Sequence, residues 1–263
     1  MTMGPVLSFP QILATIPLQA LWSYSNLLLF NLHNQRRYIT EDALNKPWRP
    51  LPSGRLTSQD TTWIMYCMYP VTIIIALKCG GLTPCLLEMV LCLWYNEWGG
   101  SDDAVLKNLI NGSGIGCFLA GPLEVATGRS IFSSQGKAAI WIAIMASAAA
   151  TTGMTQDFRD IKGDKAVGRK TIPLVIGNMN ARLLVTSFVG IFTCLSCWFW
   201  ETEWRESLFS WLTASVLVAN LVLNRTWKGD NLSWKVLWFL WLSGLFSLPV
   251  FMFSQDSLIR RSG

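Results

Sequence analysis

The chain has 263 residues, of which 51% are hydrophobic and only 14% are charged, and its formal net charge is +5. Because ordinary soluble domains carry about a quarter of charged residues, this composition excludes a soluble enzyme and indicates an integral membrane protein. The only histidine, His33, rules out zinc sites built from histidines and argues against a Ser-His-Asp triad. We expect His33 to have a role at a helix end or at the membrane interface and not in catalysis.

Apolar runs near the roughly 20 residues that cross a bilayer recur along the whole length. In chain order, we expect about eight spans, near residues 8–31, 61–79, 82–96, 105–127, 137–155, 172–198, 207–223 and 233–254. The third run is short and the fourth is partly polar. The first contains prolines and has no basic leader before it, so we expect a retained helix and not a removed signal peptide. The predicted fold class is all-α, a multispan transmembrane helical bundle formed by a single domain over residues 1–263.

Basic residues gather in the loop after the first span and in the loop after the fifth. Both loops follow odd-numbered spans, so they emerge on one side of the membrane, and their Lys and Arg density marks that side as cytoplasmic. The positive charge of this face favours an anionic substrate or anionic lipid headgroups. No nucleic acid and no obligate protein partner is expected.

Three aspartates lie between the apolar segments of the fifth and sixth spans, namely Asp157, Asp160 and Asp164. Spacings of three and four residues would place their carboxylates on one face of a helix. Like charges repel, and clustered carboxylate oxygens suit a hard cation such as Mg²⁺ better than zinc or copper. We predict that all three are catalytic and bind metal. The alternative is a solvated helix end, in which the aspartates pair with neighbouring basic residues.

The loop after the first span holds a second polar set between rigid proline turns. Its predicted metal ligands are Glu41 and Asp42, and its predicted diphosphate ligands are Asn34, Asn45, Lys46 and Arg49. Arginine and lysine bind oxygen-rich anions, so a diphosphate bridged by metal ions is the simplest ligand that uses both polar sets. The alternatives are loop-solvating charges or a helix cap for the two acids and a membrane anchor for Arg49.

Four further residues are predicted to contact the diphosphate. Lys107 and Asn108 open the fourth span on the same side, and Arg169 and Lys170 follow the three aspartates. Lys107 has the alternative of snorkelling to the membrane interface. Arg169 and Lys170 have the alternative of anchoring the protein at the cytoplasmic surface.

These residues resemble the two motifs of the UbiA superfamily of intramembrane prenyltransferases. The first family motif is Asn-(Asp/Gln)-x-x-Asp-x-x-x-Asp-x-x-Asn-Lys-Pro-x-Arg-Pro, matched here by Asn34, Gln35, Asp42, Asn45, Lys46, Pro47, Arg49 and Pro50. The second is Asp-x-x-Asp-x-x-x-Asp followed by Gly-Arg-Lys-Thr, matched here by Asp157, Asp160, Asp164, Gly168, Arg169, Lys170 and Thr171. The second match is complete. In the first, Tyr38 replaces the first aspartate. The family usually has nine spans, with one more ahead of its first motif, so a shortened start is expected here.

The resemblance implies that Mg²⁺ neutralises the diphosphate of an isoprenyl donor, which we predict to be farnesyl diphosphate. The C–O bond then breaks and an allylic carbocation forms in a central pocket that opens to the cytoplasmic face. The first motif is similar to a fungal branch that includes membrane-bound sesquiterpene cyclases, which implies cyclisation in secondary metabolism, in the endoplasmic reticulum membrane. The alternative is transfer of the prenyl group to an aromatic or other small acceptor. A transporter or channel and an inactive family member also remain open.

Overall fold

The computed structural model describes residues 7–133, 136–166 and 168–259, and every element within these ranges is helical. Seven helical segments are long and apolar enough to cross a membrane: Phe9–Arg37, Ser58–Cys79, Ala104–Thr127, Lys137–Ala166, Asn178–Phe199, Trp204–Leu223 and Trp227–Val250. The predicted third span is α4 (Leu82–Asn96), an apolar helix of 15 residues. At 1.5 Å per residue it is about 22 Å long, shorter than a hydrocarbon core of roughly 30 Å. The prediction of an all-α, multispan bundle is confirmed.

Two predicted spans have the wrong bounds. The run 172–198 is two helices, α8 (Ile172–Ile176) and α9 (Asn178–Phe199), because Gly177 between them has a φ of 91°, which glycine adopts without strain. The run 233–254 starts earlier, with α11 (Trp227–Leu232), and passes through a π-helical turn (Ser233–Leu237) into α12 (Trp238–Ile259). A π turn keeps the helix continuous while it changes the register of the side chains.

The chain divides into two compact units. The N-terminal unit comprises residues 1–147 and 166–169, and the C-terminal unit comprises residues 148–165 and 170–263. The acidic residues of the first motif belong to the N-terminal unit, and the three aspartates of the second motif belong to the C-terminal unit. The single domain over residues 1–263 stays a prediction.

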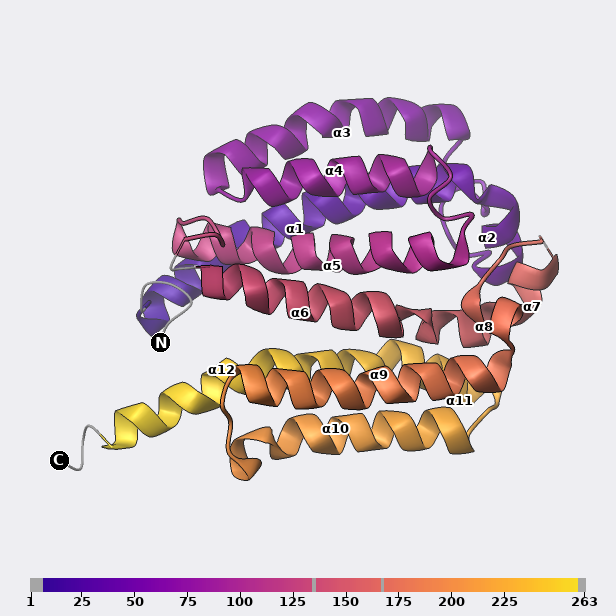
Figure 1. The fold of residues 1–263 in the computed structure, drawn as a ribbon. Coiled ribbons are helices and arrows are strands. Elements are labelled where there is room, and N and C mark those ends of the chain that lie inside the picture. The colour runs from indigo at the N-terminus through magenta and orange to yellow at the C-terminus, as the bar shows by residue number, and fades with distance from the viewer. Residues whose placement is uncertain (1–6, 134–135, 167, 260–263) are drawn as a thin grey trace. The chain divides into compact units, whose positions relative to one another are not determined.

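In the N-terminal unit, four helices lie side by side (Figure 1): α1 (Phe9–Arg37), α3 (Ser58–Cys79), α4 and α5 (Ala104–Thr127). The fully buried Trp22 of α1 fixes this packing. Its Nε1 donates to the carbonyl of Gly81 at 3.1 Å, and its ring fills the space beside Gly121, where a Cβ atom would lie 2.2 Å from the indole. Glycine at position 121 therefore lets α1 and α5 approach closely.

In the C-terminal unit, α9, α10 (Trp204–Leu223) and α12 pack against one another (Figure 1). Two fully buried tryptophans of α12 give this core its polar contacts. Trp238 Nε1 donates to Thr152 Oγ1 at 2.8 Å, and Trp241 Nε1 donates to Thr193 Oγ1 at 3.0 Å. Because a buried indole N–H without an acceptor is costly, these threonines fix the rotation of α12.

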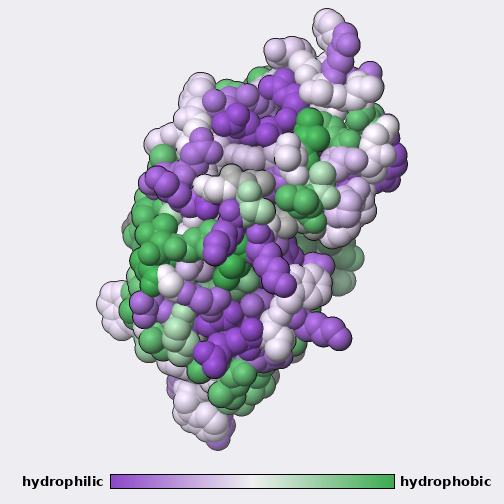
Figure 2. Space-filling view, turned by 90° about the vertical axis from the view of Figure 1, so that its right-hand side faces the viewer, coloured by the Kyte–Doolittle hydropathy of each residue, from purple (hydrophilic) through white to green (hydrophobic). Residues whose placement is uncertain are grey.

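Shorter helices carry the polar segments. In the N-terminal unit α2 (Ile39–Asn45) follows α1. Helix α6 (Lys137–Thr152) begins in the N-terminal unit and ends in the C-terminal unit, where a 3₁₀ turn (Gly153–Gln156) leads into α7 (Asp157–Ala166). Figure 2 views the side of the N-terminal unit on which α2 lies, and hydrophilic residues gather there among apolar ones. Large apolar side chains are exposed along the spans, such as Ile74, Leu77 and Ile191, as expected for helices that face lipid.

Candidate metal and diphosphate site

The three aspartates of the second motif lie on α7, so the prediction of a helix is confirmed. Asp157 and Asp164 are 1% and 2% exposed. Asp160 Oδ1 lies 3.2 Å from Arg159 Nε. The alternative of a solvated helix end is therefore wrong for the two buried aspartates, while Asp160 makes the ion pair that this alternative predicted.

A buried arginine holds α7 through the residue next to Asp157. The guanidinium carbon of Arg182 lies 4.3 Å from the ring centre of Phe158, a cation–π contact. Arg182 is 1% exposed, donates to Asp230 Oδ2 at 2.9 Å and to the Leu221 carbonyl at 2.9 Å, and forms an ion pair with Asp230 Oδ1 at 2.8 Å. Phe158 thus links α7 to α9, and through Asp230 to α11.

Sequence reasoning missed Arg182 and Asp230. A signal was present, because an arginine within an apolar span is rare and faces the interior of a bundle when it occurs. Neither residue belongs to a motif, so the motif match did not point to them.

In the N-terminal unit, four residues of the first motif come together around Asp42, which is 1% exposed. Arg49 Nη1 donates to Asp42 Oδ2 at 2.6 Å and to Asn34 Oδ1 at 3.1 Å, and Lys46 Nζ lies 3.6 Å from Asp42 Oδ1. Asp42 is therefore neither a loop-solvating charge nor the cap of α2, whose N-cap position is Tyr38. The side chain of Asn45, also predicted to bind the diphosphate, lies outside the described residues.

Glu41, the other predicted metal ligand of this unit, pairs with Arg169. Arg169 Nη1 donates to Glu41 Oε1 at 2.7 Å, and its Nη2 donates to the hydroxyl of Tyr95 at 3.3 Å. The guanidinium carbon lies 5.0 Å from the ring centre of Tyr38. Gly168 before it has a φ of 70°, a left-handed conformation that glycine adopts at low cost and that turns the chain after α7.

Tyr38 has a structural role at the position of the family's first aspartate. Its hydroxyl is hydrogen-bonded to Ser101, and its ring supports Arg169. Burial raises the pKa of Tyr38, and the neighbouring Tyr95 and Asp102 act in the same direction, so the phenol stays neutral. A neutral phenol is a poor ligand for a hard dication.

The remaining predicted contacts lie in different surroundings. Lys107 is 1% exposed, which contradicts snorkelling to the membrane interface. Asn108 is buried, and its Nδ2 donates to the carbonyl of Ala104 in its own helix at 2.8 Å. Lys170 is exposed in the segment between α7 and α8.

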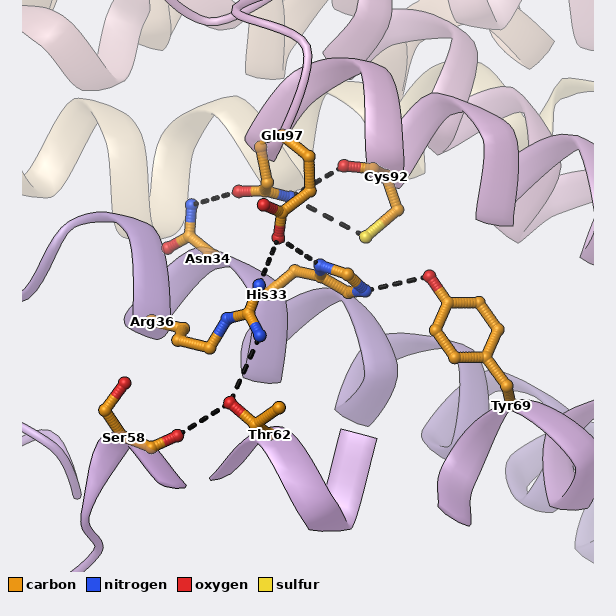
Figure 3. Close-up of polar contacts among 9 residues, drawn as sticks. His33, Asn34, Arg36, Ser58, Thr62, Tyr69, Cys92 and Glu97 are labelled. Carbon is orange, nitrogen blue, oxygen red and sulfur yellow. Dashed lines mark hydrogen bonds and ion pairs between the residues drawn. The ribbon is translucent and has the colours of Figure 1, made fainter. Parts of the chain in front are cut away.

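A polar network supports the end of α1 beside Asn34 (Figure 3). His33 Nδ1 lies 2.8 Å from Glu97 Oε1, and His33 Nε2 lies 2.8 Å from the hydroxyl of Tyr69. Arg36 donates to Glu97 Oε1 at 3.0 Å. Burial would raise the pKa of Glu97, but the hydrogen bond from His33 and the charge of Arg36 outweigh it and leave this pKa below its usual value. His33 therefore has the predicted role at a helix end, and Glu97 is a partner that sequence reasoning missed.

The donors on α7 fit Mg²⁺ better than those on α2. No three histidine, cysteine or acidic side chains of the described chain gather closely enough to hold a metal ion by themselves. Seven residues of helix rise about 10 Å, so one ion does not reach both Asp157 and Asp164. Mg²⁺ usually takes one or two carboxylates and completes its shell with substrate phosphates and water. Carboxylates one turn apart on α7 suit that role, and of these Asp160 contacts Arg159; on α2 both Glu41 and Asp42 contact arginines.

Comparisons with known proteins agree with this picture. The model of the UbiA prenyltransferase family matches residues 12–254. The chain is 31% identical to the fumagillin β-trans-bergamotene synthase of Aspergillus fumigatus over 88% of this chain and 79% of that protein. It is 34% identical to a polyprenyl transferase of Hericium erinaceus over 63% of this chain and 56% of that protein.

A solved structure of a digeranylgeranylglyceryl phosphate synthase has a similar fold, with a TM-score of 0.58 over 87% of this chain and 84% of that one, at 17% identity. At this identity the likeness concerns the fold alone. The family match covers nearly all the predicted spans and both acidic motifs. It confirms the prediction of a UbiA-type membrane enzyme and argues against a transporter. The chain belongs to the UbiA prenyltransferase family.

Proposed function

We propose that this protein ionises an isoprenyl diphosphate, farnesyl diphosphate in the first instance, releases pyrophosphate and cyclises the resulting carbocation to a terpene. The observation that carries the proposal is α7, where Asp157 and Asp164 are buried on a helix anchored by Arg182 and Asp230. Acidic residues one turn apart on a helix offer the hard oxygen ligands that a divalent cation takes. The likeness to a bergamotene synthase over 88% of the chain supports the same conclusion.

We propose that Mg²⁺ is the cofactor and that Asp157, Asp160 and Asp164 are its protein ligands, with no single ion held by both Asp157 and Asp164. When bound, Mg²⁺ would supply positive charge to the leaving diphosphate as the C–O bond breaks. The length of α7 and the chemistry of its oxygens suit an ion whose remaining ligands are phosphate and water. The three aspartates would contribute unequally to metal binding, because Asp160 already pairs with Arg159.

The chain's own cations would bind and orient the diphosphate. Arg49 and Arg169 present planar guanidinium groups, which form paired hydrogen bonds with phosphate oxygens. Asn34 and Lys46 lie with Arg49 around Asp42 and would add a donor each. Lys107, Asn108, Asn45 and Lys170 stay predicted diphosphate ligands. Fixed donors of this kind stabilise a leaving group best when its charge has fully developed.

The fate of the carbocation separates two activities. Relatives of both kinds resemble this chain, one a terpene synthase and one a polyprenyl transferase. Cyclisation is the first proposal because the synthase match covers more of the chain. The alternative is transfer of the prenyl group to an aromatic or other small acceptor. The aromatic side chains would stabilise the cation through their ring faces in either case.

The proposal also places the protein in a membrane of the cell. The Lys and Arg residues of the two motif loops would face the cytoplasm, and the fungal resemblance favours the endoplasmic reticulum. The orientation can be tested by inserting a tag in the loop 51–56 and adding protease to sealed microsomes that contain the tagged protein. A tag that is protected from added protease would contradict it.

A product assay tests the activity. Purified protein in lipid nanodiscs is mixed with Mg²⁺ and geranyl, farnesyl or geranylgeranyl diphosphate, with and without an aromatic acceptor, and pyrophosphate and hydrocarbons are measured. Pyrophosphate together with a new hydrocarbon, without acceptor, is the expected result. Release of pyrophosphate only when the acceptor is present would favour prenyl transfer. If no donor released pyrophosphate, both proposed activities would be wrong.

A further inference from the structure

We infer that the first acidic motif of this chain is an anion site without metal, in which Glu41 and Asp42 act as counter-ions that hold two arginines toward the diphosphate. The residues concerned form the α2 cluster, defined as Glu41, Asp42, Lys46, Arg49 and Arg169. That the anion is a diphosphate rests on the proposed function. The absence of metal from the cluster follows from its geometry and charge.

The first argument is the contacts of the two carboxylates. Arg49 Nη1 lies 2.6 Å from Asp42 Oδ2, and Arg169 Nη1 lies 2.7 Å from Glu41 Oε1. These are short, charge-assisted hydrogen bonds, about twice as strong as neutral ones. Lys46 approaches the other oxygen of Asp42 at 3.6 Å. A metal ion at either carboxylate would therefore lie close to a guanidinium group, whose like charge disfavours it.

The second argument is the order of the charges from the solvent inward. The side chains of Asp42 and Glu41 are 2% and 10% exposed, whereas those of Lys46, Arg49 and Arg169 are 23%, 23% and 14% exposed. Around Asp42, an approaching ion therefore meets the cations before the carboxylate, while Arg169 and Glu41 are exposed to a similar extent. This order attracts an anion and repels a dication.

The third argument is the charge balance and its dependence on Tyr38. Three cations face two carboxylates in the α2 cluster, so its formal charge is positive. An aspartate at position 38, as in the family motif, would make the cluster neutral. Tyr38 instead places its ring 5.0 Å from the Arg169 guanidinium carbon, which stabilises a cation without adding negative charge. Buried acids that hold arginines in place suit the binding of a diphosphate, because fixed guanidinium groups form paired hydrogen bonds with phosphate oxygens.

The experiment counts metal ions and measures anion affinity separately, on the full chain in nanodiscs. Bound Mn²⁺ is counted by electron paramagnetic resonance with excess inorganic pyrophosphate, and pyrophosphate affinity without metal is measured by calorimetry. The double variant Glu41→Gln with Asp42→Asn should bind as many Mn²⁺ ions as the unchanged chain. The variant Arg49→Gln should weaken metal-free pyrophosphate binding about tenfold, the loss expected for one charge-assisted hydrogen bond.

The matched control is Asp60→Asn, the same chemical change at an exposed capping residue of the N-terminal unit, which should alter neither quantity. The single variants Glu41→Gln and Asp42→Asn carry the test if the double variant has a lowered melting temperature. Loss of a Mn²⁺ ion in any folded variant of Glu41 or Asp42 would overturn the inference and leave the proposed function standing. If Arg49→Gln weakens pyrophosphate binding as expected, but the unchanged chain releases no pyrophosphate from any isoprenyl diphosphate, the inference would stand and the proposed function would be wrong.

Discussion

The two acidic segments of this chain are stabilised in opposite ways. On α2, each carboxylate of the motif is paired directly with an arginine, Asp42 with Arg49 and Glu41 with Arg169. On α7, the anchoring arginine is Arg182, which pairs with Asp230 and contacts the motif helix through the ring of Phe158. On α2 both acids of the motif pair with arginines across a turn or across the fold, whereas on α7 Asp160 pairs with its neighbour Arg159 and a further charge pair outside the motif holds the helix. Our proposal assigns the metal to α7, whose three acids lie about one turn apart on one helix.

The largest expected effect comes from the aspartates of α7. Asp157→Asn should lower the rate of pyrophosphate release from farnesyl diphosphate by roughly a thousandfold or more, because a ligand that supports charge development in the transition state is lost. Asp42→Asn should cost less, since by our inference it disturbs only the position of Arg49. The measurement is the initial rate at saturating Mg²⁺. Equal losses in the two variants would remove the contrast between the motifs.

The second effect concerns the anchor of α7. Arg182→Met leaves Asp230 buried without its partner, and breaking a buried pair in this way costs about 3–5 kcal/mol. Replacing Asp230→Leu in the same chain should recover much of the stability, because the remaining charge is gone. Unfolding in detergent by denaturant measures both variants. If the double variant regains stability but not turnover, the pair positions α7 as well as stabilising the unit. Full stability in the single variant would show that Asp230 is not buried as described.

The third effect tests why α2 excludes metal. Tyr38→Asp adds a negative charge beside Arg169 and makes the α2 cluster formally neutral, so an additional weak Mn²⁺ site is expected and the Mg²⁺ dependence of turnover should strengthen. The control Tyr38→Phe keeps the ring under Arg169 and loses only the hydrogen bond to Ser101, worth about 1 kcal/mol. Unchanged Mn²⁺ binding in Tyr38→Asp would mean that charge balance is not what excludes the ion.

Much of the fold was predictable because a membrane imposes a length on each apolar run. The predicted spans failed where local chemistry overrides that length, at the positive φ of Gly177 and at the π-helical turn after Leu232. The motifs predicted that Asp42 and Arg49 lie together, since both follow α1 within one loop. They did not predict that Arg169 would pair with Glu41, because 128 residues separate the two and only the folded chain brings them together. Arg182 and Asp230 belong to no motif, so the motifs did not point to them.

The smallest expected effect concerns the network behind Asn34, which is the counterpart of the Arg182 anchor in the N-terminal unit. Glu97 has a folded-state pKa below its ordinary value of about 4.3, so its interactions stabilise the fold above that pH and are lost as the pH falls through the lower, folded value. Glu97→Gln should make the melting temperature between pH 4 and pH 7 slightly lower and less dependent on pH than in the unchanged chain. The difference should be small, because Glu97 is partly exposed and water screens the pair. A steep pH dependence that survives in Glu97→Gln would place the titrating group elsewhere.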